Sequence, residues 1–418
     1  MTKQKRLLAL VLALVLGAGL LSGCSGGDSS SSGSGDASSA SSGESDASEQ
    51  VEPMDLTGVT DPYLATAGVA GDAVVASAGE YEILAADYLY WLNGAVESYL
   101  EQYAALGITE LPWDMDVGGM TMEEAVTQSA LEAAAFYRIL PEMGAAEGLS
   151  VSQETLDEID SQLAVLGDEG EAREHSLWYQ MLTSAVYTRV YEAAVMYTQL
   201  QERYFGEASG DYPTDAEVLA YAQDQMGVYR AKHILLLTKD MSQTVTNEDG
   251  TTGYAPLDDA VIAEKRALAD DLLAQLRAAE DPIALFDQLM NQYSEDTGLA
   301  ANPDGYTTYK GYMVPEFEDT ALSLKDGEIS EVVESDYGYH IILRLPLDPA
   351  DYREDMVAGL MQERVDQWLS ECPVQTGEVF EQIDLPQYRD NVQALQAAVL
   401  QELEGTQAAG EASSGSQS

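Results

Sequence analysis

Ala231-Lys232-His233-Ile234-Leu235-Leu236-Leu237 is a short segment rich in aliphatic residues, which is typical of a strand. Two further strands are predicted at Ile329–Glu334 and Tyr339–Leu345, joined through the turn Asp336-Tyr337-Gly338. Amphipathic patterns between the first strand and this pair predict three helices, at about residues 262–276, 282–293 and 315–322. With one more strand before the last helix, the order β-α-α-β-α-β-β predicts an α+β domain over residues 228–350.

Local signals predict how two connections of this domain are made. The polar segment with Gly250 and Gly253, directly after the first strand, is expected to be a loop. Asp281 and Pro282 provide an N-cap and a proline at the first helical position, so the second helix is expected to begin there.

The order and spacing of five short segments in this region resemble the parvulin-type peptidyl-prolyl isomerases. These segments are Lys232-His233-Ile234-Leu235, Tyr293-Ser294-Glu295-Asp296, Lys310-Gly311-Tyr312-Met313-Val314-Pro315-Glu316-Phe317-Glu318, Gly327-Glu328-Ile329-Ser330 and Tyr337-Gly338-Tyr339-His340-Ile341-Ile342. The resemblance implies a four-stranded antiparallel sheet with helices. It also implies that the chain is a peptidyl-prolyl cis-trans isomerase, or rotamase, of the PpiC type.

The same resemblance implies three catalytic residues. His233 and His340 match the paired histidines on neighbouring central strands of parvulins. Asp296 lies where the family carries a Cys or an Asp beside that pair. A carboxylate at that position would either act on the substrate carbonyl or orient a histidine, and the sequence leaves both roles open.

Three further residues are expected to bind the substrate. Met313 and Phe317 match the apolar wall of the proline pocket, and Tyr337 lies in the turn before the last histidine, where it borders the site. The sequence departs from the family pattern at Gly305 and Thr308, which replace a leucine and an aromatic residue that help to line the pocket. This departure leaves open a second hypothesis, in which the domain no longer catalyses and the chain is a holdase chaperone.

The implied reaction explains why so few kinds of residue are needed. An X–Pro bond interconverts in tens to hundreds of seconds, because amide resonance sets a barrier of about 18–20 kcal/mol. No covalent bond is broken during the rotation. A site has to hold the proline ring in an apolar pocket and favour the twisted amide, so we expect no cofactor and no metal.

The segment before the α+β domain, residues 72–227, is predicted to be mostly helical. A small hairpin is expected first, because apolar runs at residues 73–77 and 81–84 flank the turn Gly79-Glu80. Further along, Thr121-Met122-Glu123-Glu124 has the pattern of a capping box, which predicts the start of a long helix.

Helical periodicity returns after the α+β domain, over residues 351–404. These helices are too few to fold alone, so we expect them to pack on the helical module before the domain. The α+β domain is then an insertion in a mostly α-helical, chaperone-like module, an organisation similar to that of PrsA- and SurA-type extracytoplasmic foldases. Residues 405–418 are predicted to be a disordered tail.

The N-terminal segment has the features of a lipoprotein signal. Residues 1–23 contain basic residues followed by an apolar run that is short for a membrane span, and Leu21-Ser22-Gly23-Cys24 resembles a lipobox. We therefore expect lipidation of Cys24, with an ordinary signal peptide as the alternative. Residues 24–71 are predicted to be a disordered Ser- and Gly-rich tether on the extracytoplasmic face of the cell membrane.

The charge of the chain limits its partners. Its 73 acidic and 19 basic residues give a net charge of −54, whereas binding to nucleic acid requires clustered Lys and Arg. The expected partners are unfolded or newly secreted polypeptides with X–Pro bonds, and the membrane through the lipid anchor. A third hypothesis, a solute-binding lipoprotein of a transporter, is disfavoured because the sequence lacks the repeated β-α units of a two-lobed receptor.

Overall fold

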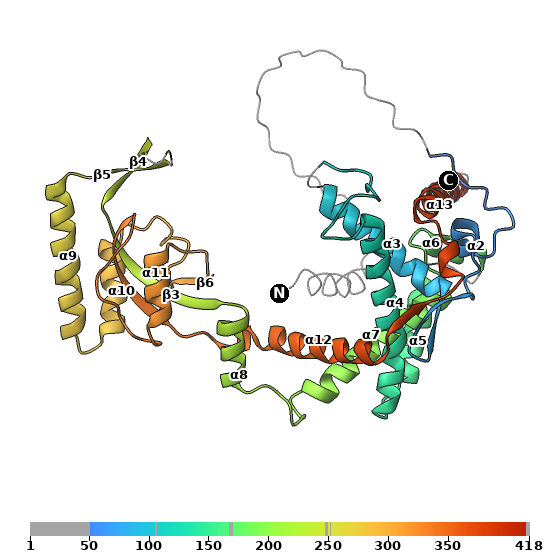
Figure 1. Cartoon of the computed structure of the whole chain (residues 1–418), viewed down its shortest axis with the longest axis horizontal. Helices are drawn as coiled ribbons and strands as arrows, with labels where there is room; N and C mark the ends of the chain where they lie inside the picture. The colour runs from blue at the N-terminus through green and yellow to red at the C-terminus, as the bar shows by residue number, and fades with distance from the viewer. Residues whose placement is uncertain (1–50, 105–106, 167–169, 247–249, 251, 415–418) are drawn as a thin grey trace, which may run out of the picture. The chain divides into compact units, whose positions relative to one another are not determined.

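The computed structural model describes residues 51–104, 107–166, 170–246, 250 and 252–414, and these form two compact units (Figure 1). One unit combines the residues up to Gly206 with those from Gln362 onward. The other unit runs from Glu207 to Met361 and contains the predicted α+β domain.

The second unit is built on an antiparallel sheet with the strand order β6-β3-β8-β7. The two central strands, β3 (Val228–Leu237) and β8 (Gly338–Leu345), pair along most of their length. β6 (Tyr306–Tyr309) and β7 (Val333–Glu334) form the edges. The predicted four-stranded antiparallel sheet is confirmed, although the strand expected at 329–334 is reduced to β7 and a single bridge between Ile329 and Leu343.

Side chains alternate between the two faces of this sheet, as the period of a strand requires. One face packs against α9 (Asp259–Ala278) and α10 (Pro282–Tyr293), which lie side by side in Figure 1. Its buried cluster includes Ile234, Leu236, Leu272, Phe286, Tyr339, Ile341 and Leu343. The expected start of α10 is confirmed, because the Asp281 carboxylate accepts a hydrogen bond from the Ala284 N–H at 3.0 Å.

On the opposite face, the short helix α11 (Pro315–Ser323) packs against β7 and β8. The buried cluster on this side contains Tyr229, Ala231, Phe317, Ala321 and Ile342. Because residues two apart on a strand share a face, His233 and His340 lie on this α11 side of the sheet.

The segment expected to be a polar loop after the first strand contains a hairpin instead. β4 (Lys239–Thr246) pairs antiparallel with β5 (Thr252–Pro256), with a register shift between Asp240 and Thr244. The side chains of this hairpin are exposed or half-buried. Their polar sequence therefore carried little of the apolar alternation by which a strand is predicted.

The second unit also extends beyond the predicted domain bounds of 228 and 350. α8 (Asp215–Ala220) and the π-helical turn η1 (Tyr221–Gln225) precede β3, and η2 (Pro349–Asp351) and the beginning of α12 (Arg353–Glu371) follow β8. A buried cluster joins these flanks to the start of the sheet and comprises Val218, Ala222, Val228, Leu347 and Tyr352. The helical module predicted over residues 72–227 therefore ends before α8.

The first unit is mostly helical. It contains α2 (Pro62–Ala67), α3 (Ala85–Ala104), α4 (Met122–Ala146), α5 (Gln153–Val165), α6 (Glu171–Trp178), α7 (Ser184–Phe205) and α13 (Leu385–Ser414). The predicted capping box is present at α4, where the side chains and backbone N–H groups of Thr121 and Glu124 bond reciprocally.

A small sheet in this unit joins segments that lie before and after the α+β domain in the sequence. The expected hairpin is formed by β1 (Val74–Ala78) and β2 (Tyr81–Leu84), and β9 (Val374–Thr376) adds to the other edge of β1. The Tyr388 hydroxyl of α13 donates to the backbone carbonyl of Leu89 at 2.9 Å. The segment after the α+β domain thus packs on the segment before it.

Two predicted boundaries are corrected at the ends of the described chain. The segment assigned to the tether contains α2, in which Tyr63 is buried and donates to the Met181 carbonyl at 3.1 Å. At the other end, α13 continues to Ser414, where a tail from residue 405 was expected. Neither the segment around α2 nor residues 405–414 show apolar periodicity, so the local pattern indicates neither α2 nor the extension of α13 beyond its predicted end.

The predicted signal peptide and Cys24 lie outside the described residues, as does the tether up to residue 50. Among the helices that the structure describes, none is both long enough and apolar enough to span a bilayer.

Candidate functional site

Two histidines meet on the α11 side of the central strands. His340 of β8 pairs in register with Leu235, and His233 of β3 pairs with Ile342, so the histidines are diagonal neighbours. Their Nδ1 atoms are 2.9 Å apart, and the two rings are nearly parallel at 17°. The local pairing of β3 and β8 therefore sets the distance between the imidazoles.

Asp296 reaches this pair from the segment that follows α10. That segment is held against β3 by hydrogen bonds at Leu235, whose N–H donates to Ser294 Oγ and whose carbonyl accepts from the Glu295 N–H. The bonds place Asp296 Oδ2 3.1 Å from His233 Nε2. Asp296 lies next to His233 because the two residues before it are hydrogen-bonded to β3.

The Asp296 carboxylate has two further hydrogen-bond donors. Tyr306 of β6 donates its hydroxyl to Oδ2 at 2.6 Å, and the Gly298 N–H donates to Oδ1 at 2.9 Å. Burial raises the pKa of Asp296, but the hydrogen bonds from His233, Tyr306 and Gly298 outweigh burial and hold this pKa below its usual value. Asp296 is therefore ionised at neutral pH. Burial and the adjacent carboxylate raise the pKa of Tyr306, which stays protonated.

The other end of the histidine pair is held by a serine. Ser335 Oγ lies 2.7 Å from His340 Nε2 and accepts a hydrogen bond from the Tyr337 N–H at 3.2 Å. Burial, and then the neighbouring His233, lower the pKa of His340 to about 3, so its ring is neutral at neutral pH. The His340 side chain is thus fixed by one partner on each ring nitrogen.

These contacts give the proton positions when both imidazoles are neutral. Asp296 is an acceptor only, so His233 carries its proton on Nε2 and accepts at Nδ1. His340 then donates from Nδ1 and accepts the Ser335 hydroxyl proton at Nε2. The result is a single chain of donors that runs from Ser335 to Asp296.

Phe317 forms an apolar boundary beside the two imidazoles. Its ring is almost fully buried and meets the rings of His233 and His340 edge-on, at centroid distances of 5.1 Å and 5.8 Å. Met313, which is half-buried, packs in the same cluster as Phe317. Tyr337 is linked through its backbone to Ser335, and its side chain is 38% exposed.

The structure thus brings His233, Asp296, His340 and Phe317 into direct contact, with Met313 adjacent.

It also adds Tyr306 and Ser335, to which sequence reasoning gave no role. Tyr306 stood inside the segment that departs from the family pattern, and Ser335 lies five residues before His340 in the turn between the last two strands. The short separation between Ser335 and His340 in the sequence could have indicated that they meet. No feature of the sequence indicates the hydrogen bond from Tyr306 to Asp296.

The departure at Gly305 has a steric reason. Gly305 has a φ of +94°, and a Cβ there would lie 2.9 Å from the Ala231 carbonyl oxygen and 2.8 Å from Leu345 Cδ1. A leucine would not fit at this position. The close approach of the turn to β3 lets Tyr306 begin the edge strand β6 and reach Asp296.

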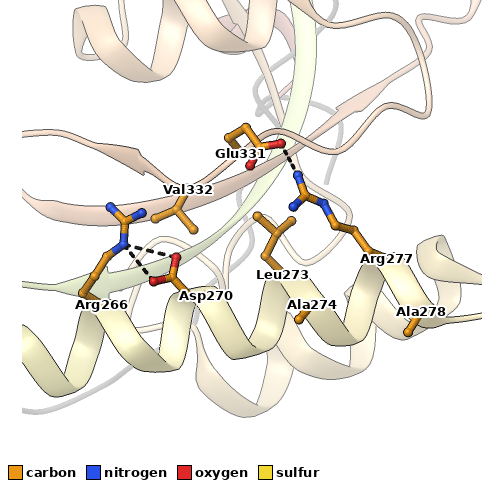
Figure 2. Close-up of a pocket in the computed structure, with 8 residues that line it drawn as sticks. All are labelled: Arg266, Asp270, Leu273, Ala274, Arg277, Ala278, Glu331 and Val332. Carbon is orange, nitrogen blue, oxygen red and sulfur yellow. Dashed lines mark hydrogen bonds and ion pairs between the residues drawn. The ribbon is translucent and has the colours of Figure 1, made fainter.

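Two other features concern possible binding sites away from the histidine pair. Among the residues that the structure describes, no group of three or more His, Cys, Asp or Glu side chains is arranged to hold a metal ion. A pocket beside α9 is lined by Leu273 and by the ion pairs Arg266–Asp270 and Arg277–Glu331, which Figure 2 shows on either side of it. α9 packs on the sheet face opposite α11, so this pocket is separate from the histidine pair.

Comparison with known proteins identifies the family to which this domain is similar. Residues 233–345 match the family model of the rotamase, or PPIC-type PPIase, domain. Foldase protein PrsA of Halalkalibacterium halodurans is 42% identical over 84 residues, which cover 20% of this chain and 24% of that protein. Foldase protein PrsA of Caldanaerobacter subterraneus subsp. tengcongensis is 27% identical over 279 residues, which cover 66% of this chain and 73% of that protein.

The extent of these similarities differs between the domain and the whole chain. The matched segments cover between 24% and 46% of the length of the first four curated relatives. A solved structure of peptidylprolyl isomerase PrsA from Bacillus cereus is 16% identical, covers 77% of this chain and 99% of its own, and has a TM-score of 0.28. At that score the structural likeness adds no argument about this chain.

Proposed function

We propose that this chain, which belongs through residues 233–345 to the PpiC-type, or parvulin-type, family of isomerase domains, catalyses cis–trans rotation about X–Pro bonds in secreted polypeptides. The observation that carries the proposal is the connected group of Ser335, His340, His233 and Asp296 beside the buried Phe317 ring. It combines a fixed polar network with an apolar wall, which are the two parts that the reaction needs.

The apolar wall would act on the proline ring. Burying the ring against Phe317 and Met313 removes water from the adjacent amide. Water stabilises the planar amide because that form has the more polarised carbonyl group. Lowering the rotation barrier by about 5 kcal/mol in this way would accelerate the rotation a few thousand-fold.

The polar network would act by holding the imidazoles in place. Both oxygens of Asp296 already accept hydrogen bonds from the protein, two at Oδ2 and one at Oδ1. This supports the second of the two roles left open by the sequence, in which Asp296 orients a histidine. His340 has a partner on both nitrogens, so its ring presents a rigid boundary to the substrate amide.

A cis–trans assay of an X–Pro peptide with the full chain tests this proposal. We expect acceleration by the wild-type chain, and a fall in kcat/KM of about 10- to 100-fold in Asp296→Asn, because His233 loses its charged partner. Asp319→Asn, an exposed aspartate on α11, is the matched control and should keep the wild-type value.

Two outcomes contradict the proposal in different ways. Equal activity of the wild-type chain and Asp296→Asn would show that the assigned site is wrong. No acceleration by the wild-type chain, together with suppression of client aggregation, would favour the holdase hypothesis.

We further propose that the chain is attached to the extracytoplasmic face of the membrane through a lipidated Cys24. The lipobox-like Leu21-Ser22-Gly23-Cys24 and the short apolar run before it support this location. Its substrates there would be newly secreted polypeptides, and the net charge of −54 disfavours nucleic acid as a partner. Palmitate labelling that persists unchanged in Cys24→Ser would refute the anchor.

A further inference from the structure

The connection between β6 and α11 carries part of the proposed pocket wall, since Met313 lies in it. Gly311 adopts a φ of +89° in this connection. Its backbone N–H donates to both carboxylate oxygens of Glu318, at 2.9 Å each. Glu318 belongs to α11 and directly follows Phe317, so one carboxylate ties the connection to the helix that carries the other wall residue.

The same carboxylate is also tied to the sheet. Tyr229 of β3 is fully buried and donates its hydroxyl to Glu318 Oε2 at 3.2 Å. Tyr229 lies four residues before His233, so the two side chains share the α11 face of the strand. Burial, and then the nearby Glu318 carboxylate, raise the pKa of Tyr229, which therefore remains a hydrogen-bond donor.

A second buried contact holds the far end of α11. Arg344 of β8 lies over the Tyr229 ring, with its guanidinium carbon 5.6 Å from the ring centroid, and donates to the Ala321 carbonyl at 3.2 Å. Its side chain is buried, and its ion pair with Asp326 is long at 3.6 Å. α11 is therefore attached to the sheet near Phe317 through Glu318 and near its end through Arg344.

We infer that Glu318 is a positioning residue for the substrate pocket: it fixes Met313 through Gly311 and Phe317 through Tyr229. The inference rests on the proposed isomerase function. Glu318 is not bonded to the histidine network, so its loss should loosen the apolar wall while leaving that network in place. Such a change weakens binding of the substrate and its transition state together, which raises KM more than it lowers kcat.

The test compares three variants of the full chain. Glu318→Ala removes the acceptor for Gly311 and Tyr229, and we expect KM for an X–Pro peptide to rise about tenfold with kcat within about twofold. Glu318→Gln keeps a carbonyl oxygen and should give an intermediate KM. Glu316→Ala, an exposed glutamate two residues earlier on α11, is the matched control and should have the wild-type KM.

The Gly311 amide resonance provides a readout that general loss of stability would not reproduce. A carboxylate acceptor shifts an amide proton downfield, so this resonance should move upfield in Glu318→Ala, less in Glu318→Gln, and remain in place in Glu316→Ala. If Glu318→Ala does not fold, the Glu318→Gln variant decides by the same two measurements. A displaced Gly311 resonance with unchanged KM would overturn the inference, as would a fall in kcat at unchanged KM.

Peptide titration followed by NMR separates this inference from the proposed function. A wild-type chain that binds the peptide without accelerating rotation would refute the isomerase proposal. The positioning role of Glu318 would then be judged by whether Glu318→Ala weakens peptide binding about tenfold relative to Glu316→Ala. Equal binding by these two variants would refute the positioning role of Glu318.

Discussion

At the scale of single residues, the site is defined by which groups are charged. Asp296 is surrounded by donors and keeps its charge, whereas His340 is buried between His233 and Ser335 and stays neutral. Because of this difference, each group in the site donates a hydrogen bond to the next one, from Ser335 towards Asp296. It also makes the stability of the domain sensitive to pH.

The pH dependence follows from His340. Its folded-state pKa is about 3, whereas an unfolded histidine titrates near 6.5. Between these values the unfolded chain binds a proton that the folded chain does not bind, so the free energy of unfolding falls as pH falls through this window. We expect β3 and β8 amides to exchange with solvent faster, relative to their intrinsic rates, at pH 5 than at pH 7.5.

The variant His340→Gln isolates this contribution. It removes the titrating ring, so the stability difference between pH 7.5 and pH 5 should shrink. Asp296 does not interfere between pH 5 and pH 7.5, because its pKa is lowered and the stability it contributes is lost only below about pH 3.8, where an unfolded aspartate titrates. An equal stability difference in wild type and His340→Gln would show that His340 is not held neutral by the fold.

At the scale of elements, the edge strand β6 depends on one glycine. Gly305 places the turn against β3, and Tyr306 follows it into the site. We expect Gly305→Ala to destabilise the second unit by about 1–3 kcal/mol. The alanine would have to adopt a strained backbone conformation, and its Cβ would meet the Ala231 carbonyl. Urea unfolding monitored through hydrogen exchange of the β3 amides measures this change.

A second glycine separates the two causes of this effect. Gly327 also has a positive φ, +81°, but the nearest atom to a Cβ there is Ile283 Cδ1 at 4.0 Å. Gly327→Ala should therefore show only the cost of the backbone conformation and remain the milder variant. If both substitutions cost the same, close packing at Gly305 is not what selects glycine.

At the scale of the whole molecule, the C-terminal segment is part of the unit that begins the chain. β9 pairs with β1, and α13 packs against α2, where Asn391 donates to the Thr66 carbonyl at 2.8 Å. The parvulin-type domain therefore lies between two segments that fold together. This is the packing expected of C-terminal helices that are too few to fold alone.

Substitutions in α13 test this organisation. Leu395 is fully buried, so Leu395→Ala should destabilise the first unit by about 2–5 kcal/mol through the cavity it leaves. Leu400 on the same helix is 46% exposed, and Leu400→Ala should change stability by less than about 0.5 kcal/mol. Trp91 and Trp178 are buried in this unit, so their fluorescence during urea unfolding reports both changes.

An equal effect of these two leucine substitutions would contradict the packing of α13 in the first unit. A loss of fluorescence-detected stability that appears only with Leu395→Ala would support it.

Features that depend on a local pattern could be predicted from the residues alone. Runs rich in apolar residues located β3 and β8, and the spacing of the histidine, Asp296 and Phe317 segments indicated a parvulin-type site. The N-cap at Asp281 and the capping box at Thr121 were also readable, because each involves residues within one helical turn.

Which residues complete the network, and where the two units end, depends on packing in three dimensions. Tyr306 reaches Asp296 through the packing of a turn on β3, and Glu318 reaches Tyr229 across 89 residues of sequence. Likewise, β9 joins β1 although nearly 300 residues lie between them in the chain. Contacts over such distances follow from how elements pack in space, which local periodicity does not encode.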